Sequence, residues 1–306
     1  MLSFKCGCQG SDELIFYGGD IMFKPSFFLV IFLSAALFLV NECFAVVPLK
    51  IINGEDQETL LTLAKKCTWG YFCIDALPAT FVVKNCLHAA DRVVLWTNEQ
   101  DQRVCCSLFD GHGEQGDCIA EAAYNQMPLF FKKQQSYDNA GITKAVHGFY
   151  AWLKKYQKTA ALWSGTTMAT VMLEKNQATL VHLGDSRIII ERDGDELFST
   201  LDHVSSLSKG AFRLERTLGD FEYFKNDATM RFVTPSVQRI GVQKGDHVII
   251  ASKGLWDVFS NTDVAQIVSF ERSNKKSLDA IAKLLAQKAR SFGSQLAVSV
   301  FIFEIR

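Results

Sequence analysis

The chain has 306 residues, enough for one large or two ordinary domains, and its 48% hydrophobic content excludes disorder over most of its length. Lys and Arg number 32 against 33 Asp and Glu, a net charge of −1, which excludes nucleic-acid binding driven by bulk positive charge. Five prolines and no long Gly or Ser run exclude collagen-like and linker-rich chains.

The first element in chain order is an apolar run. Every residue from Phe27 to Val40 is apolar except for one serine. About 20 such residues suffice to cross ~30 Å of hydrocarbon as a single helix. We therefore predict an N-terminal segment at 1–26, a hydrophobic membrane anchor at 27–47 and a linker at 48–66.

The same run fits a signal peptide if translation starts at Met22, because a short basic region then precedes it and small residues near Ala45 allow cleavage. The lysines that flank the run are Lys5 and Lys24 before it and Lys50, Lys65 and Lys66 after it. The positive-inside tendency favours a membrane-associated chain with a cytoplasmic C-terminal domain. The alternatives are entry into the secretory pathway, or a cytoplasmic protein if the N-terminus is not retained.

The rest of the chain alternates strand and helix patterns. A buried strand is predicted at 103–109, and helical patterns follow at 117–135 and 140–158. Later strands are predicted at 166–173, 178–183, 188–191, 247–252 and 297–303, and a further helix at 277–290. Turn residues such as Asp193-Gly194 indicate hairpins, so antiparallel sheets with helices packed outside are favoured over a parallel sheet.

Two interpretations compete for the segment that follows the strand at 103–109. Gly111 to Gly116 matches G-x-G-x-x-G between a strand and a helix, which is typical of dinucleotide binding. That motif also needs an acidic residue about 20 positions later, and residues 130–136 contain none. The other interpretation is a metal site at Asp110, because a carboxylate at a strand end beside an open backbone can ligate a hard cation.

Four later motifs favour the second interpretation. Together with residues 109–113, they resemble in order and spacing the PP2C (PPM) family of metal-dependent protein serine/threonine phosphatases. The motifs are Trp163–Thr170, Leu183–Arg187, Arg216–Asp220 and Ile250–Asp257. The resemblance spans about Cys67 to Phe303, so we predict a PP2C-like domain at 67–306. It implies an α+β fold, a four-layer sandwich of two central antiparallel β-sheets flanked by pairs of α-helices.

In that family, two Mn²⁺ or Mg²⁺ ions activate a water that attacks phosphoserine or phosphothreonine. Acidic side chains hold the ions, which prefer oxygen ligands. The resemblance implies that Asp110 is the bridging ligand and that the backbone carbonyl of Gly111 also binds metal. It makes Asp75 and Asp110 the candidate catalytic positions.

Several ligand positions of the family are substituted in this chain. Lys253 stands where a metal-binding Asp is expected, Leu296 replaces a second Asp, and Ile74-Asp75 replaces a Glu-Asp pair. Gly70 stands where the family has a phosphate-binding Arg. Because three carboxylates are lost and one ammonium group is gained, we predict that binding of Mn²⁺ or Mg²⁺ is weakened or lost.

The predicted function is that of a catalytically impaired PP2C-like phosphatase homologue that binds a protein or phosphoprotein, with no nucleic-acid partner. Lys253 is expected to form a salt bridge with Asp110, since a buried carboxylate without a cation is costly. Lys253 and His112 are the candidate phosphate-binding residues. The alternative function is an active metal-dependent protein serine/threonine phosphatase with an altered metal site.

Overall fold

The structure is a computed structural model that describes residues 50–51, 67–74, 90–98, 103–205, 214–226 and 230–305. The chain divides into residues 1–42 and 43–306, and every described residue belongs to the second unit. The predicted anchor or signal peptide at 27–47 lies outside the described residues. None of the described helices is both long and apolar enough to cross a membrane.

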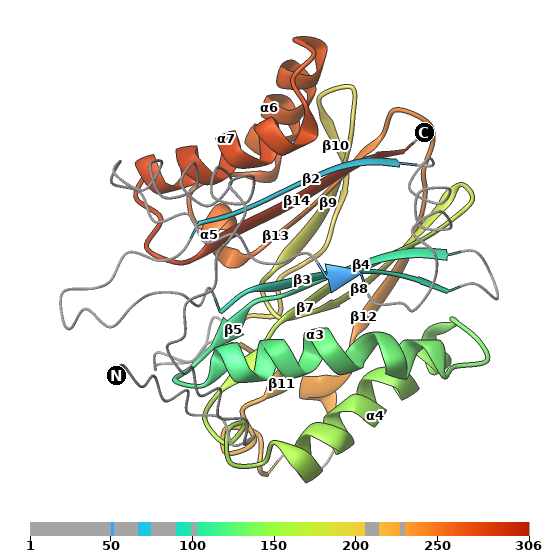
Figure 1. Cartoon of the computed structure of the whole chain (residues 1–306), viewed down its shortest axis with the longest axis vertical. Coiled ribbons are helices and arrows are strands. Elements are labelled where there is room, and N and C mark those ends of the chain that lie inside the picture. The colour runs from blue at the N-terminus through green and yellow to red at the C-terminus, as the bar shows by residue number, and fades with distance from the viewer. Residues whose placement is uncertain are drawn as a thin grey trace, which may run out of the picture. The chain divides into compact units, whose positions relative to one another are not determined.

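Two large β-sheets form the centre of the domain (Figure 1). The strands of the first sheet, in spatial order, are β1 (Lys50–Ile51), β3 (Arg92–Asn98), β4 (Arg103–Phe109), β7 (Met168–Glu174), β8 (Gln177–Leu183) and β12 (Ser236–Gly241). Those of the second are β10 (Asp195–Ser199), β9 (Arg187–Arg192), β13 (His247–Ala251), β14 (Val298–Ile305) and β2 (Cys67–Ile74). Neighbouring strands are antiparallel, except that β1 runs parallel to β3.

A small third sheet closes one end of the first sheet and carries part of the candidate site. It consists of β11 (Leu218–Gly219), β6 (Gly165–Thr166) and β5 (Gly111–His112). Because β5 follows β4 directly, its position is set by the end of a central strand of the first sheet.

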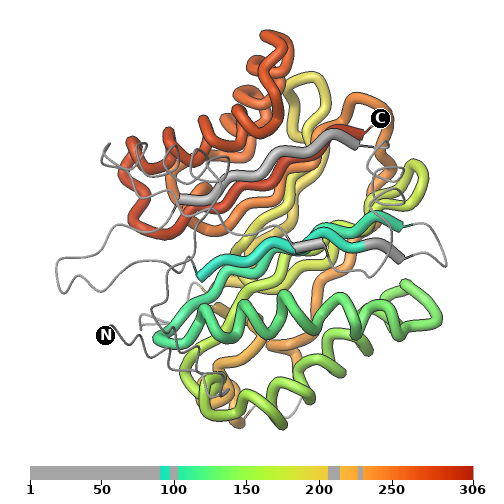
Figure 2. The backbone as a smooth tube through the Cα atoms, viewed as in Figure 1, coloured from blue at the N-terminus to red at the C-terminus, as the bar shows by residue number. Residues whose placement is uncertain are grey.

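Helices cover the outer face of each large sheet, so the domain has four layers (Figure 2). The helices on the first sheet are α3 (Gly116–Lys132) and α4 (Asn139–Tyr156), and the short η1 (Arg231–Val233) contacts α4. Those on the second sheet are α5 (Lys253–Trp256), α6 (Asn261–Ser273) and α7 (Leu278–Ser291). This arrangement confirms the predicted four-layer α+β fold.

Continuous apolar runs in the central strands follow from this layering. Ile188 and Ile190 pack in the core between the two sheets, whereas Ile189 faces the helices on the second sheet. Successive side chains of a strand point to opposite faces, and both faces are covered here. The apolar run in β9 therefore does not alternate with polar residues. The sequence pattern predicts such a strand, but it does not show which side chains face the helices and which face the other sheet.

The predicted element boundaries are correct to within a few residues. α3 ends at Lys132 rather than at residue 135, and Asp138 then caps α4 by accepting the backbone N–H of Gly141 at 2.7 Å. α6 begins directly after its N-cap residue Ser260, which forms a capping box with Asp263. The differences follow from local side-chain hydrogen bonds, which helical periodicity does not encode.

The antiparallel topology is incompatible with the dinucleotide-binding interpretation of residues 111–116. Strand β4 pairs with antiparallel neighbours on both sides, whereas that motif requires a parallel βαβ unit. The glycines have a structural explanation. A Cβ atom on Gly111 would collide with the backbone of Gly116, and Gly113 has a φ of +82°.

Candidate functional site

Asp110 lies where β4 ends and β5 begins, as the sequence predicts. One of its carboxylate oxygens accepts the backbone N–H of Lys253, with a nitrogen–oxygen distance of 3.3 Å. Its backbone carbonyl accepts the N–H of Thr167 at 2.9 Å, which joins the strand end to the segment that precedes β7. The first large sheet thus presents Asp110 to the start of α5, an element of the second sheet's layer.

A second carboxylate, Asp91, lies beside Asp110. In the β3–β4 ladder Arg92 pairs with Phe109, so Asp91 and Asp110 occupy the next facing positions. Asp91 is fully buried, and one of its oxygens accepts the Ser299 hydroxyl at 2.5 Å. Side-chain hydrogen bonds with Asp110 and Ser252 also act on this carboxyl group.

Asp185, in the turn between β8 and β9, is the third carboxylate of this group. The pKa of Asp110 is raised well above its ordinary value, first by burial and then by the nearby carboxylates of Asp91 and Asp185. Burial also raises the pKa values of Asp91 and Asp185, against the opposing effects of Ser299 and Lys253 respectively. The site therefore holds carboxyl groups that resist full ionisation together.

The side chain of Lys253 does not pair with Asp110, so the predicted salt bridge is wrong. Its ammonium nitrogen lies 2.7 Å from Asp257 Oδ1 and 3.9 Å from Asp185 Oδ2. Lys253 is the first residue of α5, so its backbone N–H faces Asp110 while its side chain meets Asp257 four positions later. These carboxylates raise the pKa of Lys253 even though burial acts in the opposite direction.

His112 is bound to a buried aspartate. Its Nε2 atom lies 2.6 Å from Oδ2 of Asp220, which is completely buried, and 3.4 Å from the Thr217 hydroxyl. Antiparallel pairing of β5 with β6, and of β6 with β11, brings these three residues together. His112 also lies close enough to Asp185 to lower the pKa of that carboxyl, so the His112–Asp220 pair borders the carboxylate group.

Of the other predicted positions, two lie on β2 and one lies between α7 and β14. Ile74 ends β2 and pairs in register with Val298, and Gly70 pairs with Ile302. Leu296 lies in the connection between α7 and β14, and its side chain is 41% exposed. Asp75 lies outside the described residues.

The described side chains do not fit a centre for two Mn²⁺ or Mg²⁺ ions. Two dications need several converging oxygen ligands. Within the described part of the chain, no three Asp, Glu, His or Cys side chains converge on a point that could hold an ion. The ammonium group beside Asp185 and Asp257 adds a positive charge instead of a ligand atom.

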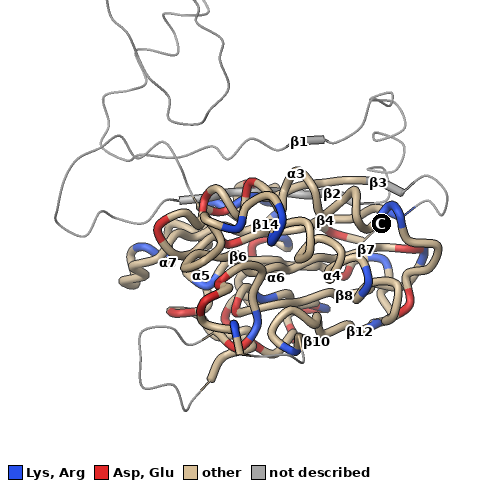
Figure 3. The backbone as a smooth tube through the Cα atoms, turned by 90° about the horizontal axis from the view of Figure 1, so that it is seen from below, with Lys and Arg blue, Asp and Glu red and all other residues tan. Residues whose placement is uncertain are grey.

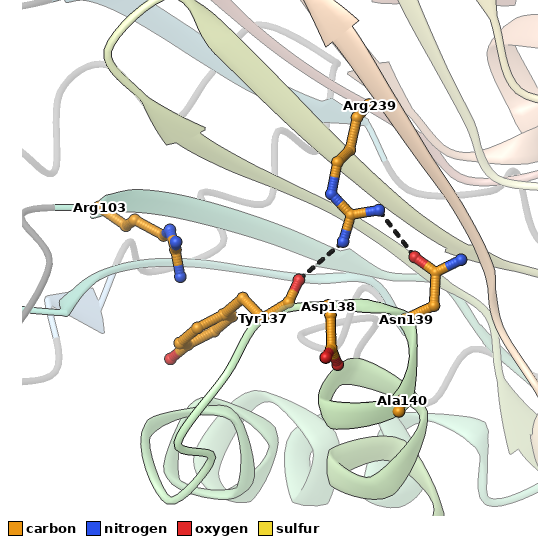
Figure 4. A pocket seen from close by; sticks show the side chains of 6 residues that line it. All are labelled: Arg103, Tyr137, Asp138, Asn139, Ala140 and Arg239. Carbon is orange, nitrogen blue, oxygen red and sulfur yellow. Dashed lines mark hydrogen bonds between the residues drawn. The ribbon is translucent and has the colours of Figure 1, made fainter.

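A separate depression of about 610 Å³ lies between the start of β4, the α3–α4 connection and β12 (Figure 4). Both of its guanidinium groups donate hydrogen bonds within the protein. Arg103 pairs with Glu174 at 2.6 Å and stacks on the Tyr137 ring, and Arg239 donates to Asn139 and to the backbone carbonyl of Tyr137. The guanidinium groups of this depression therefore already donate hydrogen bonds within the protein, and we regard it as the weaker candidate site.

Comparisons with family models, curated proteins and solved structures all find protein phosphatases. The chain matches the family model "Protein phosphatase 2C" over residues 87–216 and 208–298. This match includes Asp91, Asp110 and Lys253 and begins after Ile74 and Asp75. Asp91 is not among the residues that the sequence analysis singled out, and the signal that could have found it is an acidic residue just before an apolar strand.

Two relatives and one solved structure illustrate the similarity. The chain is 26% identical over 252 residues to "Probable protein phosphatase 2C 73" of Arabidopsis thaliana, covering 63% of this chain and 67% of that protein. It is 24% identical over 226 residues to "Protein phosphatase 2C homolog 2" of Saccharomyces cerevisiae, covering 64% of this chain and about half, 48%, of that protein. The S. agalactiae serine/threonine phosphatase structure covers 78% of this chain and 100% of its own, with 17% identity and a TM-score of 0.64.

Proposed function

The chain belongs to the protein phosphatase 2C family, and from that premise we propose that it is a catalytically impaired member that acts by binding another protein. The observation that carries this proposal is the position of the Lys253 ammonium group, within 4 Å of both Asp185 and Asp257. A dication about 4 Å from that ammonium would meet a repulsion of about 8 kcal/mol at an effective dielectric constant of 20. The Lys253 ammonium group therefore supplies Asp185 and Asp257 with a positive charge that belongs to the protein itself.

The composition of the site supports the same proposal. Leu296 offers no ligand atom where the family resemblance expects an Asp. One oxygen of Asp91 and one of Asp110 already accept hydrogen bonds from Ser299 and from the backbone of Lys253. The described residues around the site still form the four-layer fold, and binding another protein does not require phosphatase chemistry.

An active phosphatase with an altered metal site is the second candidate function. The observation in its favour is the proximity of the Asp91, Asp110 and Asp185 carboxyl groups, whose mutual repulsion a cation would relieve. Under this alternative, Mn²⁺ or Mg²⁺ would bind through these residues with few protein ligands and many waters.

Turnover in the presence of Mn²⁺ separates the two functions. We expect the full-length chain to hydrolyse a phosphoserine peptide in millimolar Mn²⁺ no faster than its Asp110→Ala variant. Calorimetric titration with MnCl₂ should give a binding constant at least tenfold weaker than that of the double variant Lys253→Asp with Leu296→Asp, because two ligand charges return.

Lys283→Asp is the control for the Lys253→Asp half of the double variant, since it makes the same charge change at an exposed position on α7. It should leave Mn²⁺ binding unchanged. Metal-dependent turnover by the unmodified chain that disappears in Asp110→Ala would overturn the impaired-enzyme proposal. A double variant that binds Mn²⁺ no better than the unmodified chain would show that Lys253 and Leu296 are not the cause.

A further inference from the structure

A run of the chain without acidic residues extends from Asn139 to Leu173, across α4 and into β7. Lys and Arg are interspersed with Asp and Glu along much of the described backbone, so such a run is a local feature (Figure 3). Three exposed lysines of the run, Lys154, Lys155 and Lys158, stand in the last turn of α4 and just after it. Positive charge is therefore concentrated at the C-terminal end of α4.

Few negative charges oppose these lysines. Among the residues that the structure describes, no salt bridge joins any of the three to an acidic side chain. Glu222, beside the turn that follows α4, is already paired with Lys225 at 2.8 Å. Glu114 is exposed and follows Gly113, which lies against the backbone of Trp163. Three lysines near one exposed glutamate leave this part of the surface positive.

Exposed aromatic side chains accompany the lysines. Tyr156 ends α4 and is 57% exposed, and the Lys155 ammonium nitrogen lies 4.9 Å from the centroid of its ring. Trp163 is 59% exposed and Tyr223 is 50% exposed, and their rings meet edge to face with centroids 5.3 Å apart. Trp and Tyr combine a flat apolar ring with a hydrogen-bonding group, so they favour places where an apolar and an aqueous phase meet.

Backbone hydrogen bonds hold the lysines and the aromatic rings together. The N–H of Ala161 donates to the carbonyl of Gln157 at 2.9 Å, so the chain turns compactly between α4 and β6. The N–H of Phe221 donates to the carbonyl of Ala161 at 3.0 Å, which places the segment of Tyr223 beside that turn. We call this region the basic–aromatic surface. It consists of Lys154, Lys155, Tyr156, Lys158, Trp163 and Tyr223.

We propose that the basic–aromatic surface docks the domain on a membrane that contains anionic phospholipids. The lysines would meet the anionic headgroups, and the exposed rings would enter the interfacial layer. Charge complementarity selects an anionic partner, and the hydrophobic run at 27–47, which is predicted to attach the chain to a membrane, favours lipid over an acidic protein. The inference does not depend on whether the candidate site is active.

Quenching of tryptophan fluorescence by brominated phosphatidylcholine tests the proposal with the full-length chain. Bromine atoms on the acyl chains quench rings that reach the bilayer. The contribution of Trp163 is the difference between the unmodified chain and Trp163→Phe, because the hydrophobic run is present in both and the buried Trp96 and Trp256 remain as background. We expect Trp163 to be quenched by vesicles with about 30 mol% phosphatidylserine, and at least about fivefold less by brominated phosphatidylcholine alone.

Removal of the three lysine charges should undo the docking. We expect the quenching of Trp163 by the phosphatidylserine vesicles to fall at least about fivefold in a triple variant, because each lysine near an anionic surface contributes about fivefold to the affinity. The triple variant combines Lys154→Gln, Lys155→Gln and Lys158→Gln. Circular dichroism confirms that each variant is folded.

A second triple variant is the matched control. It removes three lysine charges at exposed positions in the α6–α7 connection and on α7, which belong to the helix layer of the second sheet. It should change the quenching of Trp163 by less than about twofold, since these positions lie outside the basic–aromatic surface. The control combines Lys275→Gln, Lys276→Gln and Lys283→Gln.

Three results would overturn the inference. They are equal quenching with and without phosphatidylserine, an equal loss in the control and the surface variant, and no quenching of Trp163 by either kind of vesicle. In the last case, binding of a polyglutamate peptide that the surface variant loses would identify an acidic protein as the occupant instead. None of these results changes the turnover measured in the Mn²⁺ assay, so they leave the impaired-enzyme proposal as it stands.

Discussion

Lys253 determines the electrostatics of the site through the direction of its side chain. The residue opens α5, where a backbone N–H has no partner inside the helix and donates to Asp110. Its ammonium group reaches forward to Asp257 and to Asp185. One residue therefore contributes a hydrogen bond to one carboxylate and a charge to two others, and this division explains why Asp110 keeps a raised pKa beside a lysine.

Two buried histidines form a second residue-scale feature. The rings of His182 and His203 pack with centroids 4.6 Å apart, and the N–H of Gly184 donates to Nδ1 of His203 at 3.2 Å. Burial lowers the pKa of His182 to about 4 and that of His203 to about 3. Both rings are therefore neutral in the folded protein at neutral pH.

Acidification should destabilise the domain through these rings. In the unfolded chain both imidazoles take up protons near pH 6.5, whereas in the folded protein they stay neutral until about pH 4 or below. The free energy of unfolding should fall by about 2–4 kcal/mol between pH 7 and pH 4.5, because the unfolded state binds more protons in that window. Asp110 has a raised pKa in the folded protein, so it takes up its proton more readily there than in the unfolded chain. Acidification through this group therefore raises the free energy of unfolding and offsets part of the loss.

Urea denaturation of the full-length chain at several pH values measures this dependence. His182→Phe keeps an aromatic ring against His203 but removes one titrating group, so its free energy of unfolding should vary with pH by about 1–2 kcal/mol less than that of the unmodified chain. An identical pH profile for the two proteins would contradict the assignment of acid sensitivity to this ring.

At the scale of elements, helix caps decide where the helices begin. Ser277 accepts the backbone N–H of Ala280 at the start of α7, and Ser260 and Asp263 form a reciprocal capping box at the start of α6. Each cap satisfies an N–H group that has no partner inside the helix. α6 follows α5 closely, so its start lies near the segment that carries Lys253 and Asp257.

Ser260→Ala should lower the free energy of unfolding by about 1 kcal/mol, because the capping hydrogen bond to the N–H of Asp263 is lost. Thr262→Ala is the control, since it removes a hydroxyl at an exposed position in the same turn. Chemical denaturation measures both variants. A Thr262→Ala loss as large as that of Ser260→Ala would mean that the cap itself contributes little.

At the scale of the whole domain, three apolar cores among the described residues hold the layers together. One lies between the first sheet and its helices, one between the second sheet and its helices, and one between the two sheets. The inter-sheet core keeps the end of β4 next to the segment after β13, which is the relation that brings Asp110 to Lys253. The site therefore depends on the packing of the two sheets against each other.

Phe301 tests this dependence because it is completely buried in the inter-sheet core on β14. Phe301→Ala should lower the free energy of unfolding by about 3–5 kcal/mol through lost burial and a residual cavity. Phe270→Ala, at a 65% exposed position on α6, should change it by less than about 0.5 kcal/mol. Comparable losses in the two variants, measured by thermal denaturation, would contradict the assigned core.

Much of the fold follows from the sequence alone. The apolar residues 103–109 predict a buried strand, and in the structure both faces of β4 are covered. The turn residues between the predicted strands indicate antiparallel pairing, which β4 shows with both neighbours. The order of the motifs from residue 109 to residue 257 is sufficient to indicate the family and to single out Asp110 and Lys253. These properties are local or ordered along the chain, so the sequence contains them directly.

The contacts of the site depend on tertiary structure. Asp91 adjoins Asp110 only through the register of β3 on β4, and Lys253 meets Asp185 only because the turn after β8 packs beside the start of α5. Neither relation has a signature in residue spacing, since it joins segments that are distant in the chain. The sequence thus determined which charged groups the domain carries, while the packing of its layers decided which carboxylate the lysine neutralises.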